Sequence, residues 1–469
     1  MAPQAVESQQ AVERPQAVEV AETIAALDAR AFDPAMRAKA KACLLDFLGC
    51  AFEATALDPS RQAMAAVFEA PGGHIIGETA TATPADAAFV NAVKGHGLVR
   101  EDMHAASVSH HGVVVWPLLL ALAETRRIAG SRLLEAAILA YEVGGRLGRL
   151  LIDRGMSSLF RPTGLVAPIG AAAGGARLLG LDAPSTASAL AIAANTSSGL
   201  NQWPASGASD MFFHPGFAAR NAVMAVRLAE AGAYGSRDIL DGKAGLFAAF
   251  ARKPMPSAIA LFPRGEAEIL AVYHKGAPAC NFAQTACQAA LRMIEMIGPN
   301  VAPVSAITIR VPLAAADYPG CDHTGPFERA LQAKMSIPFG VAAVLAHGRL
   351  AEENYADLAD AKVLRLVGVT TLVASDELSA RFPAEQGAIV ELTLADDRRL
   401  SMGLPDVIPA TEAEVRQRFR VAAAAVVGQD AADAIEAFVD TLDTARDAGR
   451  LMQLCAVPAA ARPKTANAP

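Results

Sequence analysis

A helical pattern runs almost unbroken from about Ile24 to Arg252, and it restricts the possible folds of this chain more than any other feature. Apolar residues recur in it at intervals of three and four, as over Arg37–Glu53 and Val113–Ile128, which is the spacing of one face of an α-helix. Only 5% of the residues are aromatic although 53% are apolar, so the core is rich in Ala, Leu and Val, as in packed helices. We therefore predict a large all-α domain.

The pattern changes near residue 265. Beyond it, three short segments rich in β-branched residues are typical of strands. After Pro405 the helical pattern returns, and Thr411 with Glu414 forms a capping box at the start of the next helix. This order predicts a mainly α fold, in which a smaller α+β lid domain is inserted into the large all-α helical domain. The expected strands are Ala306–Pro312, Val367–Val373 and Ala388–Leu394, with helices at Phe282–Ile297 and Phe339–His347.

Domain boundaries follow from these changes of pattern. Residues 21–265 and 406–457 are expected to form the all-α domain, and residues 266–405 the α+β lid. Residues 1–20 repeat a short Gln-Ala-Val-Glu unit and residues 458–469 are rich in Ala and Pro, so both are expected to be disordered tails. Since ligands commonly bind between domains, we expect the site in the cleft between the all-α domain and the lid.

The composition argues against several classes of protein. The net charge is −7 and no block of Lys or Arg occurs, so nucleic-acid binding has no electrostatic basis. The longest apolar runs, such as Gly112–Ala123, are too short to span a membrane, and the N-terminus has no signal-peptide pattern. The six cysteines form no CxxC pair, which argues against a disulfide framework or zinc site and favours a reducing, cytoplasmic compartment. Motifs of phosphate-binding loops, dinucleotide-binding units and nucleophile elbows are absent, so nucleotide and redox-cofactor enzymes are disfavoured.

The strongest chemical signal is a histidine-rich stretch, residues 96–112, between two apolar helical segments. Histidine suits acid–base catalysis because its charge changes near neutral pH, and a neighbouring carboxylate can fix its tautomer. A solvated loop whose histidines cap helices is one alternative. A metal site made by three of these histidines and Asp102 is another, but the stretch lacks a fixed ligand spacing such as HExxH. Its histidines and charged residues are His96, Arg100, Glu101, Asp102, His104, His110 and His111.

A second stretch carries residues suited to bind an anion. His214 precedes Pro215 and Gly216, where a helix is expected to begin, and the free N–H groups at the start of a helix attract carboxylates. Arg220 follows one to two turns later and is long enough to reach a carboxylate. A plain capping turn explains the histidine equally well, and an ion pair within the all-α domain explains the arginine.

Further candidates come from the lid. Lys275 lies in a Pro-bounded turn at the domain junction, where partial burial would lower its pKa and make it a usable base; an exposed hinge lysine is the simpler interpretation. Ser336 precedes an apolar helix and either caps it, the more common role, or contacts an anion. Tyr318 and His323 lie in a Gly/Pro-bearing loop and are candidates to cover the cleft. Cys280 is more typical of a small buried residue than of a nucleophile.

Taken in order, these segments resemble the MmgE/PrpD family, which includes 2-methylcitrate dehydratase, cis-aconitate decarboxylase and iminodisuccinate epimerase. The resemblance implies an all-α domain with an α+β lid, a homodimer, a site between the domains and a reaction without a cofactor. It also implies that Lys275 is the active-site lysine of the lid and that His110 or His111 is the loop histidine, a one-residue difference in length leaving the choice open. The matching pieces include Leu44–Gly49, Pro117–Glu124, Ala140–Val143, Ala171–Leu181, His214–Ala219, Lys275–Cys280 and Ala333–Ala342.

The departures from the family pattern are informative. The dehydratases and decarboxylases carry Asp-Phe-Asp-Asp-Thr in the first loop, where this chain has Val99–Met103, so the leading Asp and the Thr are replaced. A family histidine appears as Arg161, a lysine as Met211 and a tyrosine as Phe339. These replacements remove groups that would handle a leaving hydroxide or carbon dioxide, and they keep groups that move a proton.

The retained residues suit an epimerase that removes and returns a proton next to a carboxylate of a small di- or tricarboxylic acid. The expected catalytic residues are His104 or His110 with Asp102 from the all-α domain, and Lys275 from the lid, on opposite faces of the carbon. Two alternatives remain: a lyase of the same family, in which Glu101 or Asp102 replaces the missing acid, and a non-catalytic carboxylate-binding protein. We expect no metal and no cofactor. Expected contacts to the substrate are Arg100, His111, Arg161, His214, Arg220, Tyr318 and Ser336.

Overall fold

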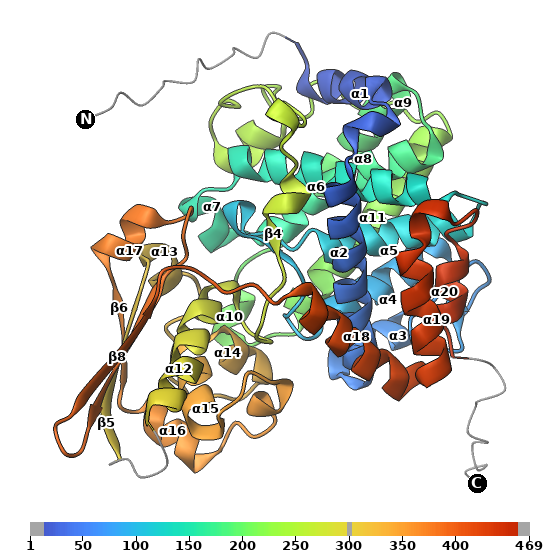
Figure 1. Cartoon of the computed structure of the whole chain (residues 1–469). Helices are drawn as coiled ribbons and strands as arrows, with labels where there is room; N and C mark the ends of the chain where they lie inside the picture. The colour runs from blue at the N-terminus through green and yellow to red at the C-terminus, as the bar shows by residue number, and fades with distance from the viewer. Residues whose placement is uncertain (1–13, 298–302, 458–469) are drawn as a thin grey trace.

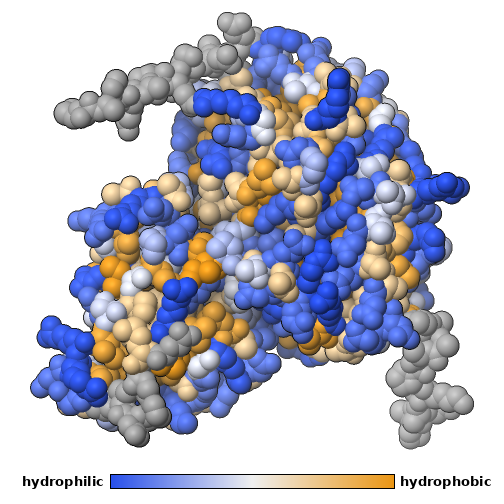
Figure 2. Space-filling view, in the orientation of Figure 1, coloured by the Kyte–Doolittle hydropathy of each residue, from blue (hydrophilic) through white to orange (hydrophobic). Residues whose placement is uncertain are grey.

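The computed structural model describes residues 14–297 and 303–457, and Figure 1 shows two parts of unequal size. The larger part is helical, and the smaller part carries a four-stranded sheet beside helices. The mainly α fold expected from the sequence is thereby confirmed. Figure 2 shows a largely hydrophilic surface on which apolar residues lie in small groups. None of the helices in the described ranges has the length and apolar character needed to cross a membrane.

The larger part is formed by the N-terminal helices and by three helices that return from the smaller part. α18 packs along α2, and the Thr411–Glu414 capping box at its start is present as predicted. The elements are α1 (Gln16–Ala26), α2 (Pro34–Glu53), α3 (Asp58–Ala66), β1 (Gly73–His74), β2 (Thr81–Ala82), α4 (Pro84–His96), β3 (Met103–His104), α5 (Gly112–Glu124), α6 (Gly130–Leu151), α7 (Arg154–Leu159), α8 (Pro162–Leu179), α9 (Ala183–Ala194), α10 (Trp203–Ser206), α11 (Asp210–Glu230), α18 (Glu412–Val427), α19 (Gln429–Asp440) and α20 (Arg450–Cys455).

Glycine allows α6 and α8 to pack closely at the centre of the larger part. A Cβ at Gly170 of α8 would lie 2.5 Å from the carbonyl oxygen of Ala140 in α6. One at Gly174 would lie 2.6 Å from the carbonyl oxygen of Ala136. Any larger residue would force the helices apart, so the small-residue composition of α8 sets the distance between the two backbones.

The smaller part is built on a sheet with the strand order β6-β5-β7-β8. β5 pairs parallel with β6 and antiparallel with β7, which pairs antiparallel with β8. Residues of β7 alternate between buried and half-buried, and α12 packs on this sheet. The strands are β5 (Val304–Val311), β6 (Thr370–Ala374), β7 (Ala388–Leu394) and β8 (Arg399–Leu404); the helices are α12 (Gln284–Ile297), α13 (Leu313–Ala316), α14 (Ala330–Met335), α15 (Ile337–His347), α16 (Ala361–Val367) and α17 (Asp376–Arg381).

The chain passes between the two parts twice, and the two crossings lie together. In the first crossing, β4 (Val272–Tyr273) pairs antiparallel with β3, which belongs to the histidine-rich stretch. In the second, the backbone N–H of Ala410 donates to the carbonyl oxygen of His274 at 2.9 Å. The histidine-rich stretch is therefore held directly against the segment that leads into the smaller part.

The predicted N-terminal tail, residues 1–20, is too long. α1 begins at Gln16, because the apolar residues that follow are buried at helical spacing and pack into the larger part. Residues 1–13 and the predicted C-terminal tail, residues 458–469, lie outside the described residues.

Two other expected boundaries are corrected. The strand predicted at Val367–Val373 begins only at Thr370, since the preceding apolar residues complete α16. The helix predicted to begin after His214 begins at Asp210 and continues through Pro215. The proline removes one backbone hydrogen bond, but α11 packs along α4 over much of its length and that packing maintains the helix.

Candidate active site

A narrow cavity lies between the two parts of the molecule. Its walls come from the histidine-rich stretch, from the start of α8 and from α10 and α11, and on the other side from residues 280–335. A wider surface depression beside α7 shares Tyr318 with it. The lining residues are Val99, Met103, Val108, His110, Arg161, Trp203, Met211, Cys280, Asn281, Phe282, Tyr318 and Met335.

Of the histidines in the stretch, His110 lines this cavity. Its Nδ1 lies 3.0 Å from Oε1 of Glu101 and 3.0 Å from the carbonyl oxygen of Asp102. Both are acceptors, so Nδ1 carries the hydrogen, and the lone pair of Nε2 has no partner among the described residues. Burial lowers the pKa of His110 to about 3, which keeps the imidazole uncharged in the empty site. A neutral imidazole with a free Nε2 can accept a proton from a bound molecule.

Glu101 links His110 to a second histidine. Its Oε1 lies 2.6 Å from Nδ1 of His96, so one carboxylate oxygen accepts hydrogen bonds from both rings. Burial alone would raise the pKa of Glu101, but the two imidazoles and their hydrogen bonds outweigh burial and hold the pKa well below its usual value. Glu101 is therefore an anion behind His110, placed to stabilise the imidazolium that forms when His110 takes a proton.

Arg161 provides a cation on the cavity wall. It directly precedes α8, is 5% exposed, and its Nη2 lies 3.1 Å from Nε2 of His96. Its guanidinium carbon is 5.6 Å from the ring centre of Trp203, a cation–π contact. No carboxylate of the described residues pairs with it, and its Nε has no hydrogen-bond partner there. Since a buried charge is unfavourable without a counter-ion, the cavity is suited to a ligand that carries a carboxylate.

Three positions that depart from the family pattern lie on the same wall. Val99, Met103 and Met211 all line the cavity, where the resemblance leads us to expect Asp, Thr and Lys. Arg161, a further departure, also lines it, whereas Phe339 does not and instead stacks on Tyr355, with ring centres 5.9 Å apart. The wall near His110 is therefore apolar where the family pattern is polar.

Asp102 lies behind the cavity wall. The hydroxyl of Tyr141 donates to its Oδ2, and the backbone N–H of Gly112 donates to its Oδ1 at 3.2 Å. Burial raises the pKa of Asp102 to about 6. The carboxyl group fixes the first turn of α5 and thereby the backbone that carries His110.

His104 and His111 belong to a second network, which does not line the cavity. Nε2 of His104 lies 2.6 Å from Oε2 of Glu268, and its Nδ1 lies 2.7 Å from Oγ of Ser107. The same Oγ is 3.3 Å from Nε2 of His111, and two arginines of α6 also pair with Glu268. Both nitrogens of His104 are thus occupied. In the part of the chain that the structure describes, no group of three or more His, Cys, Asp or Glu side chains is arranged to hold a metal.

Lys275 is fully buried at the junction but does not line the cavity. Its Nζ donates to the carbonyl oxygen of Ala279 at 2.9 Å, and its own carbonyl accepts from Nη1 of Arg418 in α18 at 2.8 Å. Burial lowers the pKa of Lys275, and the charge of Glu101 partly opposes this. The simpler interpretation, an exposed hinge lysine, is therefore wrong.

Other expected substrate contacts lie apart from the cavity. Nη1 of Arg100 donates to Oε1 of Glu53 at 3.1 Å. Arg220 is exposed on α11 and pairs with Asp86 at 2.9 Å. His214 lies within α11, and burial lowers its pKa to about 4, with a contribution from the nearby charge of an arginine.

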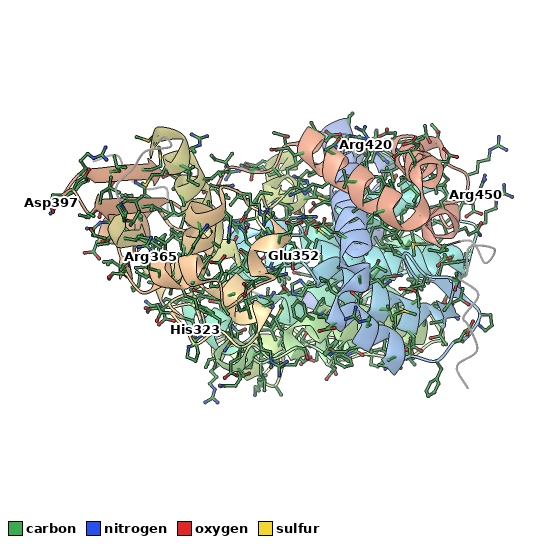
Figure 3. All side chains as sticks on the ribbon, turned by 90° about the horizontal axis from the view of Figure 1, so that it is seen from below. His323, Glu352, Arg365, Asp397, Arg420 and Arg450 are labelled. Carbon is green, nitrogen blue, oxygen red and sulfur yellow. The ribbon has the colours of Figure 1, made fainter. Side chains whose placement is uncertain are left out.

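The lid candidates have different positions. Tyr318 lines the cavity, and its hydroxyl accepts from Nδ2 of Asn201 at 3.3 Å. Ser336 caps α15 by accepting from the N–H of Phe339 at 3.0 Å, the more common of its two expected roles. His323 lies at the outer edge of the smaller part, as Figure 3 shows, and contacts the carbonyl oxygen of a nearby proline. The structure thus brings together His110, Arg161 and Tyr318.

Several residues of the site had no role in the sequence prediction. Trp203, Asn281 and Phe282 line the cavity but belong to no polar cluster. Glu268 pairs with His104 across 164 residues, a contact that no local pattern predicts. The rarity of tryptophan, with two in the chain, is the one signal that could have drawn attention to Trp203.

Comparison with known proteins shows that both parts match domain models of the same protein family. The MmgE/PrpD N-terminal domain model matches residues 18–258, and the MmgE/PrpD C-terminal domain model matches residues 277–444. A cis-aconitate decarboxylase-like protein, oryM of Aspergillus oryzae, is 27% identical over 461 residues, which cover 89% of this chain and 92% of that protein. The cis-aconitate decarboxylase of Aspergillus terreus is 31% identical over 219 residues, 45% of this chain and 44% of that protein. The human cis-aconitate decarboxylase is 33% identical over 183 residues, 37% of each chain.

Proposed function

Because this chain belongs to the MmgE/PrpD family, we propose that it is an enzyme that removes and returns a proton at the carbon next to a carboxylate of a small di- or tricarboxylic acid. It acts as an isomerase, in particular an epimerase, of the iminodisuccinate type. His110 and Arg161, on one cavity between the two parts, are its central residues.

The observation that carries this proposal is the chemical state of these two side chains. His110 is neutral and presents a free Nε2 to the cavity, while Glu101 accepts from its other nitrogen. Arg161 is a buried cation without a carboxylate partner among the described residues. Together they supply what removal of a proton next to a carboxylate requires: a base, and a positive group for the charge that develops.

The reaction begins when the substrate carboxylate binds Arg161. That negative charge beside His110 favours the protonated imidazole, so binding raises the basicity of Nε2. Nε2 removes the proton, and the electron pair moves into the carboxylate, whose second negative charge Arg161 stabilises. Glu101 stabilises the imidazolium through Nδ1. Return of a proton to the opposite face completes the inversion.

The cavity wall favours this reaction over elimination. Loss of hydroxide requires a positioned acid near the leaving group. Val99, Met103 and Met211 supply none, and Asp102 lies behind the wall with both of its oxygens hydrogen-bonded. At these three positions a substrate held by Arg161 therefore meets no group that could protonate a departing oxygen, whereas the family pattern has polar groups there.

Decarboxylation is the second candidate, and two observations favour it. The relatives named above are cis-aconitate decarboxylases or a decarboxylase-like protein. A carboxylate placed against the apolar wall loses its hydration, which destabilises it relative to neutral carbon dioxide. In this reaction His110 would have to bind the substrate as the imidazolium, whose Nε2–H then protonates the carbon left behind and leaves the neutral ring. Release of carbon dioxide separates this candidate from the epimerase.

The test is proton NMR in D2O with purified, EDTA-treated enzyme and a panel of iminodisuccinate, aspartate derivatives, 2-methylcitrate, citrate and cis-aconitate. We expect deuterium to enter next to a carboxylate without loss of water or carbon dioxide. Vinyl signals or a decarboxylated product would support the lyase. Tight binding with no exchange or turnover of any compound would contradict both. The homodimer implied by the resemblance remains a prediction, which light scattering of the purified protein tests.

A further inference from the structure

The six cysteines all lie in described ranges, and all are buried and free, but one differs from the rest in position. Cys280 lines the cavity together with His110 and Arg161. A molecule in the cavity therefore meets this thiol. The five that do not line it are Cys43, Cys50, Cys287, Cys321 and Cys455.

Local structure holds the Cys280 thiol in place. The backbone N–H of Cys280 donates to the carbonyl oxygen of Lys334 at 2.8 Å, and the residue directly precedes the short helix η7 (Asn281–Ala283), which leads into α12. Its Sγ lies 3.7 Å from Sγ of Cys321, and the backbone N–H of Phe282 also hydrogen-bonds to it. The Phe282 N–H and the Cys321 thiol thus both lie against one sulfur at the cavity wall.

These surroundings favour the thiolate at Cys280 and oppose it at its neighbours. The hydrogen bond from Cys321, with the charges of Lys275 and Arg161, outweighs burial and lowers the pKa of Cys280 to about 7. By contrast, burial raises the pKa of Cys287 to about 12 and also raises that of Cys321. Cys280 lines the cavity and its surroundings favour the thiolate, so it is the thiol placed to exchange a proton with a bound molecule.

Two unpartnered donors at the same cavity point to a bound ligand. Nε of Arg161 and Nε1 of Trp203 have no hydrogen-bond partner among the described residues, although each side chain is more than nine-tenths buried. Such donors are unfavourable unless a ligand or water satisfies them. His110 of the larger part and Cys280 of the smaller part line the same cavity as Arg161, so both can approach an acid whose carboxylate binds Arg161.

We propose that Cys280 is the second acid–base residue of the reaction, acting on the face of the substrate carbon opposite His110. This inference rests on the proposed function, because an epimerase needs a proton carrier on each face. With one epimer, Nε2 of His110 takes the proton, the C–H electron pair moves into the carboxylate held by Arg161, and the Cys280 S–H gives its proton to the other face. The site is left with an imidazolium and a thiolate. The other epimer is converted by the reverse steps, so atoms and charge balance in both directions.

Lys275 is then a positioning residue. Its Nζ donates to Ala279, and its side chain is not on the cavity wall, so it acts on the Cys280 thiolate through its charge. This division of roles explains why a buried lysine and a cavity-facing thiol occur in one short turn.

The test is Cys280→Ser, assayed in D2O with each stereochemically pure epimer of the exchanging substrate. Wild-type enzyme should exchange and invert both epimers. The variant should still exchange, with retention, the epimer that His110 deprotonates, while inversion falls by on the order of 10²–10⁴-fold. Cys287→Ser, which changes a buried thiol away from the cavity, is the matched control and should keep both reactions.

Inversion by Cys280→Ser at nearly the wild-type rate overturns this inference and leaves the proposed function intact. Absence of exchange by the wild-type enzyme overturns the proposed function, and the inference with it. If the serine variant does not fold, alkylation of wild-type protein with iodoacetamide at pH 7.5 replaces it. Cys280 should then react first and be protected by substrate; unprotected reaction, or none, contradicts the inference.

Discussion

The histidine-rich stretch contributes to two hydrogen-bonded networks that look alike and differ in access. In the cavity network (His96, Glu101, His110, Arg161), Glu101 lies 2.6 Å from one ring and 3.0 Å from the other, and Nε2 of His110 remains free at the cavity. In the sealed network (His104, Ser107, His111, Glu268, Arg146, Arg149), the His104–Glu268 distance is also 2.6 Å, but Ser107 occupies the other nitrogen. A histidine beside a carboxylate therefore does not by itself identify a base.

What separates the two networks is the helix that covers one of them. A Cβ at Gly148 of α6 would lie 2.3 Å from Cβ of Ser107, so α6 packs directly against the side of the sealed network that carries Ser107. His110, by contrast, precedes α5 at the junction of the two parts, where the smaller part leaves a cavity. The comparison predicts catalytic loss from changes in the cavity network and mainly loss of stability from changes in the sealed one.

The largest effect is expected from His110→Asn. The amide can keep the hydrogen bond made by Nδ1, but it removes Nε2, so kcat/KM should fall by about 10³–10⁴-fold with little change in the free energy of unfolding. Steady-state kinetics and urea unfolding measure the two quantities.

The matched control is His104→Asn in the sealed network. We expect it to keep kcat/KM within about tenfold of wild type and to lower the free energy of unfolding by about 1–3 kcal/mol, since Glu268 loses a buried partner. If this variant loses activity as severely as His110→Asn, the distinction between the networks is wrong.

The next largest loss of activity is expected from a change of Arg161, the cation on the cavity wall. Arg161→Met should reduce kcat/KM by about 10²-fold, through both KM and kcat, because a charge-assisted hydrogen bond to the substrate carboxylate contributes about 1.5–3 kcal/mol. Arg220→Met, which changes an exposed arginine paired with Asp86, should leave both constants near wild type. Equal effects of the two variants on KM would contradict the assignment of Arg161.

A smaller effect is expected from Lys275→Met. If the lysine acts on the Cys280 thiolate through its charge, removing it should raise the pKa of Cys280 by about one unit and reduce kcat by about tenfold. The loss should be partly recovered at higher pH. A loss as large as that of His110→Asn, unchanged between pH 6 and 9, would instead mean that Lys275 transfers the proton itself.

The smallest effect on activity, and a large one on stability, is expected from Glu268→Gln. Burial would raise the pKa of Glu268, but the hydrogen bond from His104 and the charges of Arg149 and Arg146 outweigh it and lower the pKa to about 2. Because the folded pKa is depressed, this stabilisation is complete above about pH 4.5 and is lost as the pH falls toward 2.

The free energy of unfolding of the variant should therefore be about 3 kcal/mol lower than that of wild type at pH 7. Removal of the carboxylate leaves its buried partners without a counter-charge. The difference from wild type should shrink between pH 5 and pH 3 in urea titrations. A difference that stays constant over this range would show that the charge of Glu268 is not responsible.

Much of the fold could be predicted because its signals are local. β7 was predicted with its observed bounds from a short segment rich in β-branched residues, and the capping box at Thr411 was predicted from two residues three apart. α11 was misjudged at Pro215, because its continuity depends on packing against α4 rather than on propensity. The start of α1 was predicted to be a disordered tail for the same reason, since the surface that buries its apolar face comes from residues far away in sequence.

The sequence predicted which segments contribute to the site, but not how their side chains are arranged. The sequence located the histidine-rich stretch, Arg161 and Lys275, but gave no means to choose between His104, His110 and His111. That choice depends on which nitrogen is left free, and partners distant in sequence decide it: Glu268 occupies His104, and α6 covers the sealed network. Cys280 was discounted because buried cysteines are common, whereas its cavity position depends on how the two parts meet.

The most direct test of the account is the rate of deuterium incorporation next to the substrate carboxylate, measured by NMR for wild-type, His104→Asn and His110→Asn enzymes on one substrate. We predict that His104→Asn incorporates deuterium at a rate within about tenfold of wild type, and that His110→Asn does so at least about 10²-fold more slowly. Comparable incorporation by His110→Asn and wild type would show that the free nitrogen at the cavity is not the base.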